Sequence, residues 1–430
     1  MFASKIENAP LALTFDDVLL EPAASWVEPD QADVTSRFSR GIPLNIPLVS
    51  AAMDTVTEAA MAIAIAREGG IGVIHRNLPV EDECRNVVLV KQAEELVERQ
   101  VQSVRPDATV AEVEALMSRH GIGGVPVVDE SDRVIGIVSR RDVRAIANRR
   151  GRESIRAIMT PSPITADESF TMEDALETMY TNKVERLPVT DEKGHLVGII
   201  TMQDVLEKRQ YPRAIRDRNG NLRVAAAVGP FDHARAMALV EAGVDALVVD
   251  CAHGHNLNVV RAVQEIKGSV DVDVMAGNIA TRAAAEALVG TVDGIKVGIG
   301  PGSICTTRIV AGVGVPQISA IAAVAEIAGP ADVPVCADGG VRFSGDIAKA
   351  IAAGAESVML GSLLAGTDES PGRIVAIKGR RYKQYRGMGS LGVMTTGQSS
   401  DRYFQKKEIG RTKFVPEGVE GATPYVGRVS

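Results

Sequence analysis

Eight short apolar segments, separated by helix-like stretches, are the feature that most restricts the fold of this sequence. They lie at residues 46–51, 71–75, 223–229, 246–250, 273–277, 294–298, 334–340 and 357–362. Apolar strands that alternate with amphipathic helices, such as those expected at 233–243 and 343–354, indicate a parallel sheet covered by helices. Eight such units predict an α/β fold of the (β/α)8 TIM-barrel type. The alternative, a doubly wound open sheet, usually has fewer strands and a GxGxxG turn after the first.

Polar and glycine-rich residues follow six of these segments. In a (β/α)8 barrel the loops after the strands meet at one face and form the active site. The residues expected at that face are His75, Asp250, Asn278, residues 298–305, Asp338, Gly339, Gly340, Gly361 and Ser362. We therefore expect one site that draws on several strand ends.

An internal repeat interrupts this pattern after the second strand and its helix. "GGVPVVDESDRVIGIVSRRDV" at 123–143 returns as "ERLPVTDEKGHLVGIITMQDV" at 185–205, an offset of 62 residues. An amphipathic helix pattern precedes each copy, at 109–120 and 171–182. Two copies are too few for a solenoid, so we expect them to pack as a pseudo-twofold pair.

The position of the repeat predicts the domain organisation. The first part of the catalytic barrel takes residues 1–94, and the second part takes 208–430. The inserted module takes 95–207, with halves at 95–152 and 153–207. Within the second part, residues 379–421 are polar, basic and glycine-rich without a clear period, which predicts an active-site flap.

Charge and cysteine content restrict the class of function. The net charge is −8, from 47 basic and 55 acidic residues, so binding to nucleic acid through a basic surface is not expected. No apolar run reaches the length of a membrane span, and the N-terminus has no apolar signal segment. The four cysteines lack metal-ligand spacing, and His253 and His255 are better explained as loop residues than as zinc ligands. These features indicate a cytoplasmic protein.

The stretch "GPGSICTT" at 300–307 contains a single cysteine in a flexible turn. From its position alone, Cys305 is either a nucleophile or a structural thiol. Asp16 and Asp17, near the N-terminus, are better explained as structural capping residues than as a catalytic pair.

Seven motifs together resemble the inosine-5′-monophosphate (IMP) dehydrogenase family. They are "LTFDDVLL" (13–20), "SAAMDTVTE" (50–58), "GGIGVIHRN" (69–77), "GIGPGSICTT" (298–307), "ADGGV" (337–341), "YRGMGSLG" (385–392) and "SSDRYF" (399–404). The repeat resembles the tandem CBS (Bateman) module of that family. The resemblance covers nearly the whole chain in order.

This resemblance implies oxidation of IMP to xanthosine 5′-monophosphate (XMP) with NAD, the committed step of guanine nucleotide synthesis. Cys305 matches the nucleophile that attacks C2 of the purine and forms a covalent thioimidate, the E-XMP intermediate. Arg402 and Tyr403 match the flap pair that replaces departed NADH. Arg402 then activates water, helped by Thr307.

The resemblance also implies binding residues. Those matching IMP contacts are Ser303, Asp338, Gly339, Gly340, Gly361, Ser362, Tyr385, Arg386, Gly387, Met388, Gly389 and Glu417. Those matching the NAD side are Asp250, Asn278, Gly298, Ile299 and Gly300. Main-chain carbonyls of Gly300, Gly302 and Cys305 match a K⁺ site. Because the chain has no Rossmann fingerprint, NAD is expected at the barrel mouth.

Regulation and assembly are further implications of the resemblance. Asp142 and Asp204, each in an S/T-x-x-D element, match residues that hold the ribose of adenine or guanine nucleotides in CBS modules. The family assembles as homotetramers. Its members continue beyond the position of Ser430 with a last barrel helix and a glycine-bearing tail, which is expected to complete the K⁺ site of a neighbouring subunit.

Two rival functions are weighed against the dehydrogenase. GMP reductase shares the barrel and the cysteine loop, but usually lacks the CBS insert and the "SSDRYF" flap, both of which occur here. A catalytically inactive, CBS-bearing regulatory protein would not need Cys305, Thr307, Arg402 and Tyr403.

Overall fold

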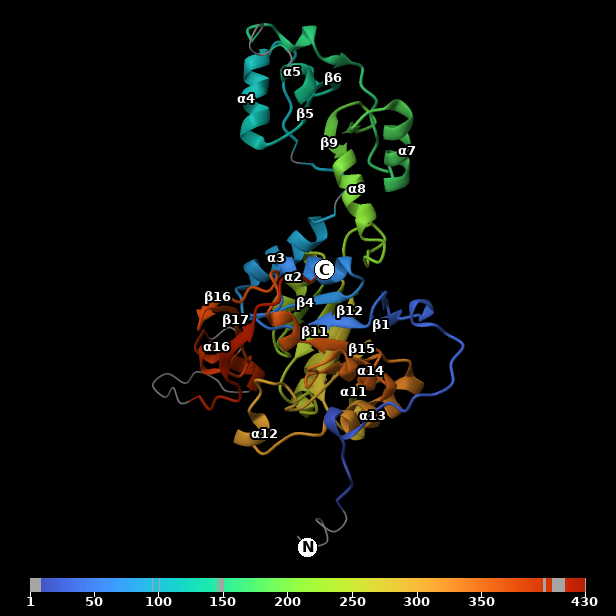
Figure 1. Ribbon diagram of the computed structural model, residues 1–430, viewed down its shortest axis with the longest axis vertical. Coiled ribbons are helices and arrows are strands. Elements are labelled where there is room, and N and C mark those ends of the chain that lie inside the picture. The colour runs from blue at the N-terminus through green and yellow to red at the C-terminus, as the bar shows by residue number, and fades with distance from the viewer. Residues whose placement is uncertain are drawn as a thin grey trace. The chain divides into compact units, whose positions relative to one another are not determined.

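The computed structural model describes residues 9–429, except 95, 100, 145, 147–150, 397–399 and 404–413 (Figure 1). The chain forms two compact units. One contains Met1–Ala93 and Arg213–Ser430, and the other contains Glu94–Pro212. Of the flap interval 379–421, residues 397–399 and 404–413 lie outside the described residues.

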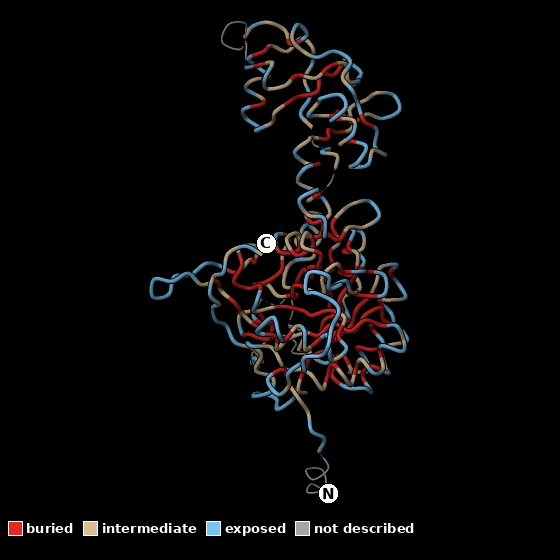
Figure 2. The backbone as a smooth tube through the Cα atoms, turned by 45° about the vertical axis from the view of Figure 1, so that its right-hand side comes forward, coloured by how far each residue is buried: buried red, intermediate tan, exposed pale blue. Residues whose placement is uncertain are grey.

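A closed barrel of eight parallel strands forms the first unit. Its strands are β3 (Leu48–Ser50), β4 (Ile71–Ile74), β10 (Ala225–Val228), β11 (Ala246–Asp250), β12 (Asp273–Ile279), β13 (Gly294–Val297), β14 (Val335–Asp338) and β15 (Ser357–Leu360). The barrel closes where β15 pairs with β3, with Leu360 opposite Ser50. All eight predicted segments are barrel strands, so the predicted fold class is confirmed. Most strand residues are buried, because each strand has a packed interior on one side and helices on the other (Figure 2).

Helices cover the outside of the barrel (Figure 1). They are α2 (Ala59–Arg67), α3 (Val80–Gln92), α9 (His233–Glu241), α10 (Leu257–Ser269), α11 (Arg282–Leu288), α13 (Gln317–Ala328), α14 (Ser344–Ala352) and the short α12 (Thr307–Val310) and α15 (Ser362–Ala365). Side-chain caps fix several starts: Asp232 accepts from the Arg235 amide, and Thr281 accepts from the Ala284 amide. None of the helices in the described part of the chain combines the length and apolar character needed to span a bilayer.

Two elements at the edges of the barrel were not predicted. A hairpin of β1 (Ser36–Ser39) and β2 (Ile42–Leu44) buries Phe38 near the N-terminal ends of β12 and β13, where Ser39 donates to Asp273. A three-stranded antiparallel sheet contains β16 (Ile374–Ile377), β17 (Arg380–Arg386) and β18 (Glu420–Pro424). The flap interval therefore begins and ends in regular strands, with α16 (Leu391–Thr396) and the 3-10 turn η5 (Ser400–Tyr403) between them.

The second unit contains two similar halves. The first has α4 (Val110–His120), β5 (Gly124–Val128), β6 (Val134–Ser139), α5 (Arg140–Arg144), η3 (Ile155–Ala157) and β7 (Thr160–Pro161). The second has α7 (Met172–Asn182), β8 (Arg186–Thr190), β9 (Leu196–Thr201) and α8 (Met202–Gln210). Thr109 and Thr171 begin the two long helices with capping boxes, and each half has its own apolar core.

The two halves meet through their strand–strand turns. The amide of Val134 donates to the Gly194 carbonyl at 3.0 Å, and the amide of Leu196 donates to the Asp132 carbonyl at 3.0 Å. These reciprocal bonds give the two halves the pseudo-twofold relation that the repeat predicts.

Candidate active site

A cavity opens at the C-terminal ends of the barrel strands. Its walls come from the loops after seven chain segments, including the flap. The lining residues are 51–53, Asp250, Ala252, Asn278, Lys296, 298–305, Thr307, 338–341, Met359, Gly361, Ser362, Tyr385, 387–389, Arg402, Tyr403, Glu417 and Gly418. Of the site residues predicted in the barrel, all line this cavity except two: Arg386, whose side chain turns to Asp54 instead, and His75, which is fully buried behind the wall.

Cys305 lies in the loop between β13 and α12. Its Sγ donates to Thr307 Oγ1 at 3.2 Å, and its amide donates to the Gly302 carbonyl at 3.1 Å. The loop needs glycine at two points: Gly298 has φ +151° with the Asp338 carbonyl pressed against it, and Gly300 has φ +78°. The thiol is thus held at the cavity wall by a loop whose path requires glycine at residues 298 and 300.

Lys296 is a buried cation at the floor of the cavity, and sequence reasoning missed it. Its side chain is 1% exposed, and Nζ donates to Asp250 Oδ1 at 2.9 Å and to Asp338 Oδ2 at 2.8 Å. Nζ also contacts Asn278 Oδ1, while Asn278 Nδ2 donates to Asp338 Oδ2 at 2.9 Å. The ammonium compensates the charge of both carboxylates at the cavity floor. The sequence did contain a signal for this site residue, because a charged lysine lies inside the otherwise apolar segment 294–298.

Arg402 reaches into the cavity from η5. Its guanidinium pairs with Asp250 Oδ2, and its carbonyl accepts from the Ala252 amide at 3.0 Å. Burial lowers the pKa of Arg402, because the charged form loses its hydration. Its Nε has no hydrogen-bond partner among the described residues. One carboxylate oxygen of Asp250 therefore contacts Arg402, and the other contacts Lys296.

Tyr403 and Tyr385 close two further sides of the cavity. The Tyr403 ring packs against Gly389, where a side chain would come within 2.8 Å of the ring. Tyr385 lies against Gly361 and hydrogen-bonds to Ser303, and burial raises the pKa of its phenol to about 12. Burial also raises the pKa of Tyr403. Both phenols therefore stay protonated and uncharged at physiological pH.

Gly339 and Gly340 form a tight turn after β14, and both have positive φ, +92° and +86°. Behind this turn lies the 3-10 turn η1 (Phe15–Asp17), whose Phe15 ring would be 3.3 Å from a Cβ at Gly340. Asp17 caps η1 by accepting from the Thr14 amide at 2.7 Å, as the capping interpretation predicted. Asp16 instead pairs with Arg342, next to the turn.

The two aspartates predicted to bind nucleotide lie in the second unit, outside this cavity. Asp142 Oδ2 accepts from the amide and hydroxyl of Ser139, at 2.9 and 2.6 Å. Asp204 Oδ2 accepts from Thr201 in the same way. In each half, this oxygen caps the helix that follows the second strand.

Comparison with known proteins places this chain among purine-nucleotide enzymes. The IMP dehydrogenase / GMP reductase domain family matches residues 12–430. The chain is 56% identical to the inosine-5′-monophosphate dehydrogenase of Methanocaldococcus jannaschii, covering 100% of this chain and 88% of that protein. It is 55% identical to the enzyme of the same name from Halobacterium salinarum, covering 100% and 86%.

Among solved structures, the chain is similar to a GMP reductase from Trypanosoma brucei in complex with guanosine 5′-monophosphate. The TM-score is 0.85 at 40% identity, covering 99% of this chain and 89% of that one. This match includes the inserted unit, so the presence of the insert does not by itself separate dehydrogenases from GMP reductases. Sequence identity, higher to the dehydrogenases, remains as the distinction.

Proposed function

The chain belongs to the IMP dehydrogenase / GMP reductase family, and from this premise we propose that it oxidises IMP to XMP with NAD as the second substrate. The observation that carries the proposal is that Cys305 and Thr307, from the segment after β13, line one cavity with Arg402 and Tyr403 from η5. This set contains a nucleophile for the first chemical step and a candidate base for the second.

In the first step, the Cys305 thiol releases its proton to solvent, Sγ forms a bond to C2 of the purine, and C2 loses a hydride. NAD, when bound, supplies the hydride acceptor. The product on the enzyme is a thioimidate between C2 and Sγ. The hydrogen bond from Cys305 to Thr307 supports this role, because it fixes the direction of the thiol at the cavity wall.

In the second step, water attacks C2, the C2–Sγ bond breaks, and XMP and the free thiol are formed. A base must take the proton from this water. Arginine is an unusual base because its ordinary pKa is far above neutral. Burial lowers the pKa of Arg402, and this supports its assignment as the base.

IMP fits the cavity by the chemistry of its walls. The backbone amides of Gly339, Gly340 and Gly361, with Ser303 and Ser362, suit the phosphate, because loops after the last two barrel strands commonly bind phosphate. Asp338 suits the ribose hydroxyls. The wall at 387–389 and Glu417 suit the hypoxanthine base.

NAD is assigned to the part of the cavity formed by Asp250, Asn278 and the loop 298–300. Arg402 pairs with the same Asp250 carboxylate that would meet the cofactor. The flap and NAD would therefore compete for one group, consistent with the flap entering after NADH leaves. A K⁺ ion is proposed at the carbonyls of Gly300, Gly302 and Cys305, whose donor chemistry suits a weakly hydrated monovalent ion.

Two further features are proposed with the activity. The protein assembles as a homotetramer, which multi-angle light scattering of the purified chain tests. The second unit binds purine nucleotides through Asp142 and Asp204. Isothermal titration with ATP and GTP tests this, and the absence of heat with either nucleotide would contradict it.

Absorbance at 340 nm tests the activity and separates it from GMP reductase, which the structural neighbour favours as the second candidate. We expect NADH formation with IMP and NAD, and no NADPH consumption with GMP. Cys305→Ser should abolish turnover. Arg402→Ala should leave a single-turnover burst of NADH but slow steady-state turnover. A variant that slows the burst and leaves hydrolysis fast would refute the assignment of Arg402.

A further inference from the structure

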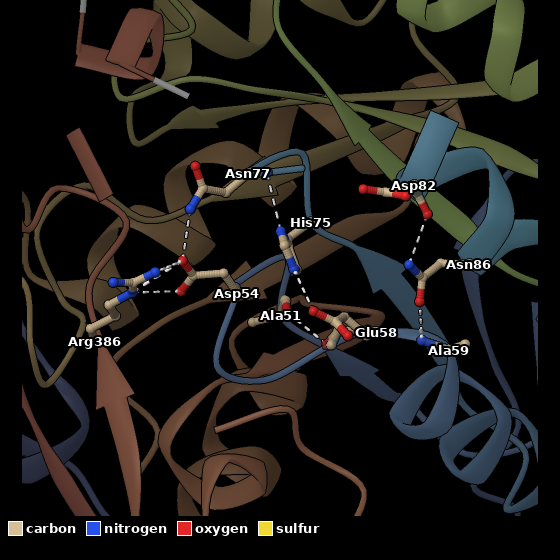
Figure 3. Close-up of polar contacts among 10 residues, drawn as sticks. Ala51, Asp54, Glu58, Ala59, His75, Asn77, Asp82, Asn86 and Arg386 are labelled. Atoms are coloured by element: carbon tan, nitrogen blue, oxygen red, sulfur yellow. Dashed lines mark hydrogen bonds and ion pairs between the residues drawn. The ribbon is translucent and has the colours of Figure 1, made fainter. Parts of the chain in front are cut away.

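Asp54 and Arg386 form an ion pair beside the cavity (Figure 3). Arg386 Nε lies 3.2 and 3.1 Å from the two carboxylate oxygens of Asp54, and Nη2 donates to Oδ2 at 2.5 Å. The side chains are 6% and 23% exposed for Asp54 and Arg386, respectively. A further bond, from the Arg386 amide to Thr55 Oγ1 at 3.3 Å, joins the same two segments.

Neither residue of this pair lines the cavity, but their neighbours in the chain do. Asp54 directly follows Met53 in the loop after β3, and Arg386 lies between Tyr385 and Gly387 at the end of β17. The pair therefore acts from behind the wall formed by residues 385–389, which we name the base wall. It can affect ligand binding only through the position of that wall.

The barrel holds Asp54 from its other side. Asn77 Nδ2 donates to Asp54 Oδ2 at 2.8 Å, and the Asn77 amide donates to Nδ1 of the buried His75 at 3.1 Å. Because His75 Nδ1 accepts, Nε2 carries the ring proton and faces Glu58 Oε1 at 3.4 Å. Asp54 and Glu58 follow β3, and His75 and Asn77 follow β4, so the carboxylate is fixed on the barrel. Figure 3 shows the contacts among these side chains.

Arg386 is confined on the flap side as well. Glu420 of β18 accepts from the Gly392 amide at 2.8 Å, at the start of α16. A side chain at Gly392 would collide with Glu420 and would come within 3.1 Å of Arg386 Nη1. The guanidinium thus fills the space between the barrel loop and the base of the flap.

We propose that Asp54 and Arg386 are positioning residues that fix the base wall against the barrel and so set the affinity for the purine base of IMP. A guanidinium–carboxylate pair in this geometry fixes orientation as well as distance, which a single hydrogen bond does not. The proposal rests on the proposed function for the identity of the ligand. Because the base is bound in both the ground state and the transition state, loss of the pair should raise KM more than it lowers kcat.

The test is Asp54→Asn, which keeps the shape and the contact with Asn77 but removes the charge. We expect the KM for IMP and the Kd of IMP, measured by calorimetry without NAD, each to rise about tenfold, with kcat within about threefold. Arg386→Lys keeps the charge without the planar fork and should give a smaller rise in both constants. The matched control is Asp332→Asn, which removes the carboxylate of a surface pair with Arg37 and should leave both constants unchanged.

Two results would overturn the proposal. One is a Kd for IMP within twofold of the parent in Asp54→Asn or, if that variant does not fold, in Arg386→Lys. The other is a kcat that falls by the same factor in Asp54→Asn as in the Asp332→Asn control. A parent protein that neither binds nor oxidises IMP would instead refute the proposed function.

Discussion

At the scale of single residues, Lys296 is the group on which both sides of the cavity depend. It holds Asp250, which meets the flap arginine, and Asp338, which faces the proposed ribose site. Lys296→Met should leave Asp338 without its cation and Asp250 with Arg402 alone, at a cost of about 3–5 kcal/mol in unfolding free energy. Turnover should fall by about a hundredfold, because Asp250 and Asp338 lose the group that positions them; this corresponds to a rise of about 2.7 kcal/mol in the activation free energy.

Urea unfolding and the 340 nm assay measure both effects of Lys296→Met. Arg85→Met is the control, because Arg85 forms an exposed pair with Asp82 on α3, away from the cavity. The control should change stability by less than about 1 kcal/mol. Parent-like turnover in Lys296→Met would show that the lysine is a packing residue only.

Glu83 on α3 makes the stability of the barrel depend on pH. It is fully buried against Arg235, and burial raises its pKa to about 8. Between the unfolded pKa near 4.5 and the folded value, the folded state retains a proton that the unfolded state releases. Stability should therefore fall as pH rises through this window, by at most ~1.4 kcal/mol per pH unit.

Glu83→Gln should remove this slope, whatever it does to stability at one pH. The measurement is urea unfolding at several pH values between about 5 and 8. Glu81→Gln, an exposed carboxylate on the same helix, is the control and should keep the slope of the parent. A parent protein whose stability rises with pH across this window would contradict the assignment.

The residues of the site differed in how far the sequence could predict them. Cys305 and Asp338 follow apolar strands, so the strand-end rule and the motifs found them. Lys296 lies within a strand. Strands were identified from runs of apolar residues, so a lysine inside such a run was not assigned a role. The Asp54–Arg386 pair joins positions 332 residues apart, and no local pattern connects them.

At the scale of elements, the N-terminal turn η1 supports the proposed phosphate loop. Phe15 is 2% exposed behind Gly340, Lys349 donates to its carbonyl at 2.8 Å, and Asp16 pairs with Arg342. Phe15→Ala should remove the support, lowering stability by up to about 3–5 kcal/mol and raising the KM for IMP.

Thermal unfolding and IMP titration measure the effect of Phe15→Ala. Leu19→Ala removes another large apolar side chain from the same segment, but Leu19 is 88% exposed and its loss should change neither quantity. If Phe15→Ala lowered stability without changing the KM, η1 would be a structural anchor with no influence on the loop.

The sheet of β16, β17 and β18 shows why the flap interval was hard to predict. The sequence of β17, "RRYKQYR", is charged, and its burial alternates only in its second half. Lys383 is buried there because its ammonium donates to the carbonyls of Thr367 and Asp368, at 2.7 and 3.3 Å, and also contacts that of Ser370. Because β17 buries a lysine and pairs with distant residues 420–424, its sequence lacks the alternation of apolar and polar residues that usually indicates a strand.

At the scale of the whole molecule, the inserted unit is the part that sequence predicts best. Its repeat copies helix, strand, turn and strand in register, and each copy has capping residues and its own core. Such local patterns do not depend on the rest of the chain. The barrel could also be predicted, because eight short strands with intervening helices have only one common closed arrangement.

Removal of residues 94–212 should leave a folded barrel that oxidises IMP. The strands on either side of the insertion, β4 and β10, pair directly, with Val73 opposite Ala225. Lys91, just before the insertion, contacts Asp217, just after it, at 2.8 Å, so the two chain ends converge. A linker of six glycine and serine residues reaches roughly 20 Å and can join Ala93 to Arg213 without strain.

We expect kcat/KM for IMP within about threefold of the parent, because no cavity residue lies in the removed part. Removal of 99–161 alone is the matched comparison: it removes the first half, so the second half loses its contacts with Asp132 and Val134, and it should give a less soluble protein. An insoluble barrel after the full excision, or one whose activity falls more than tenfold, would show that the barrel needs the insert to fold or to act.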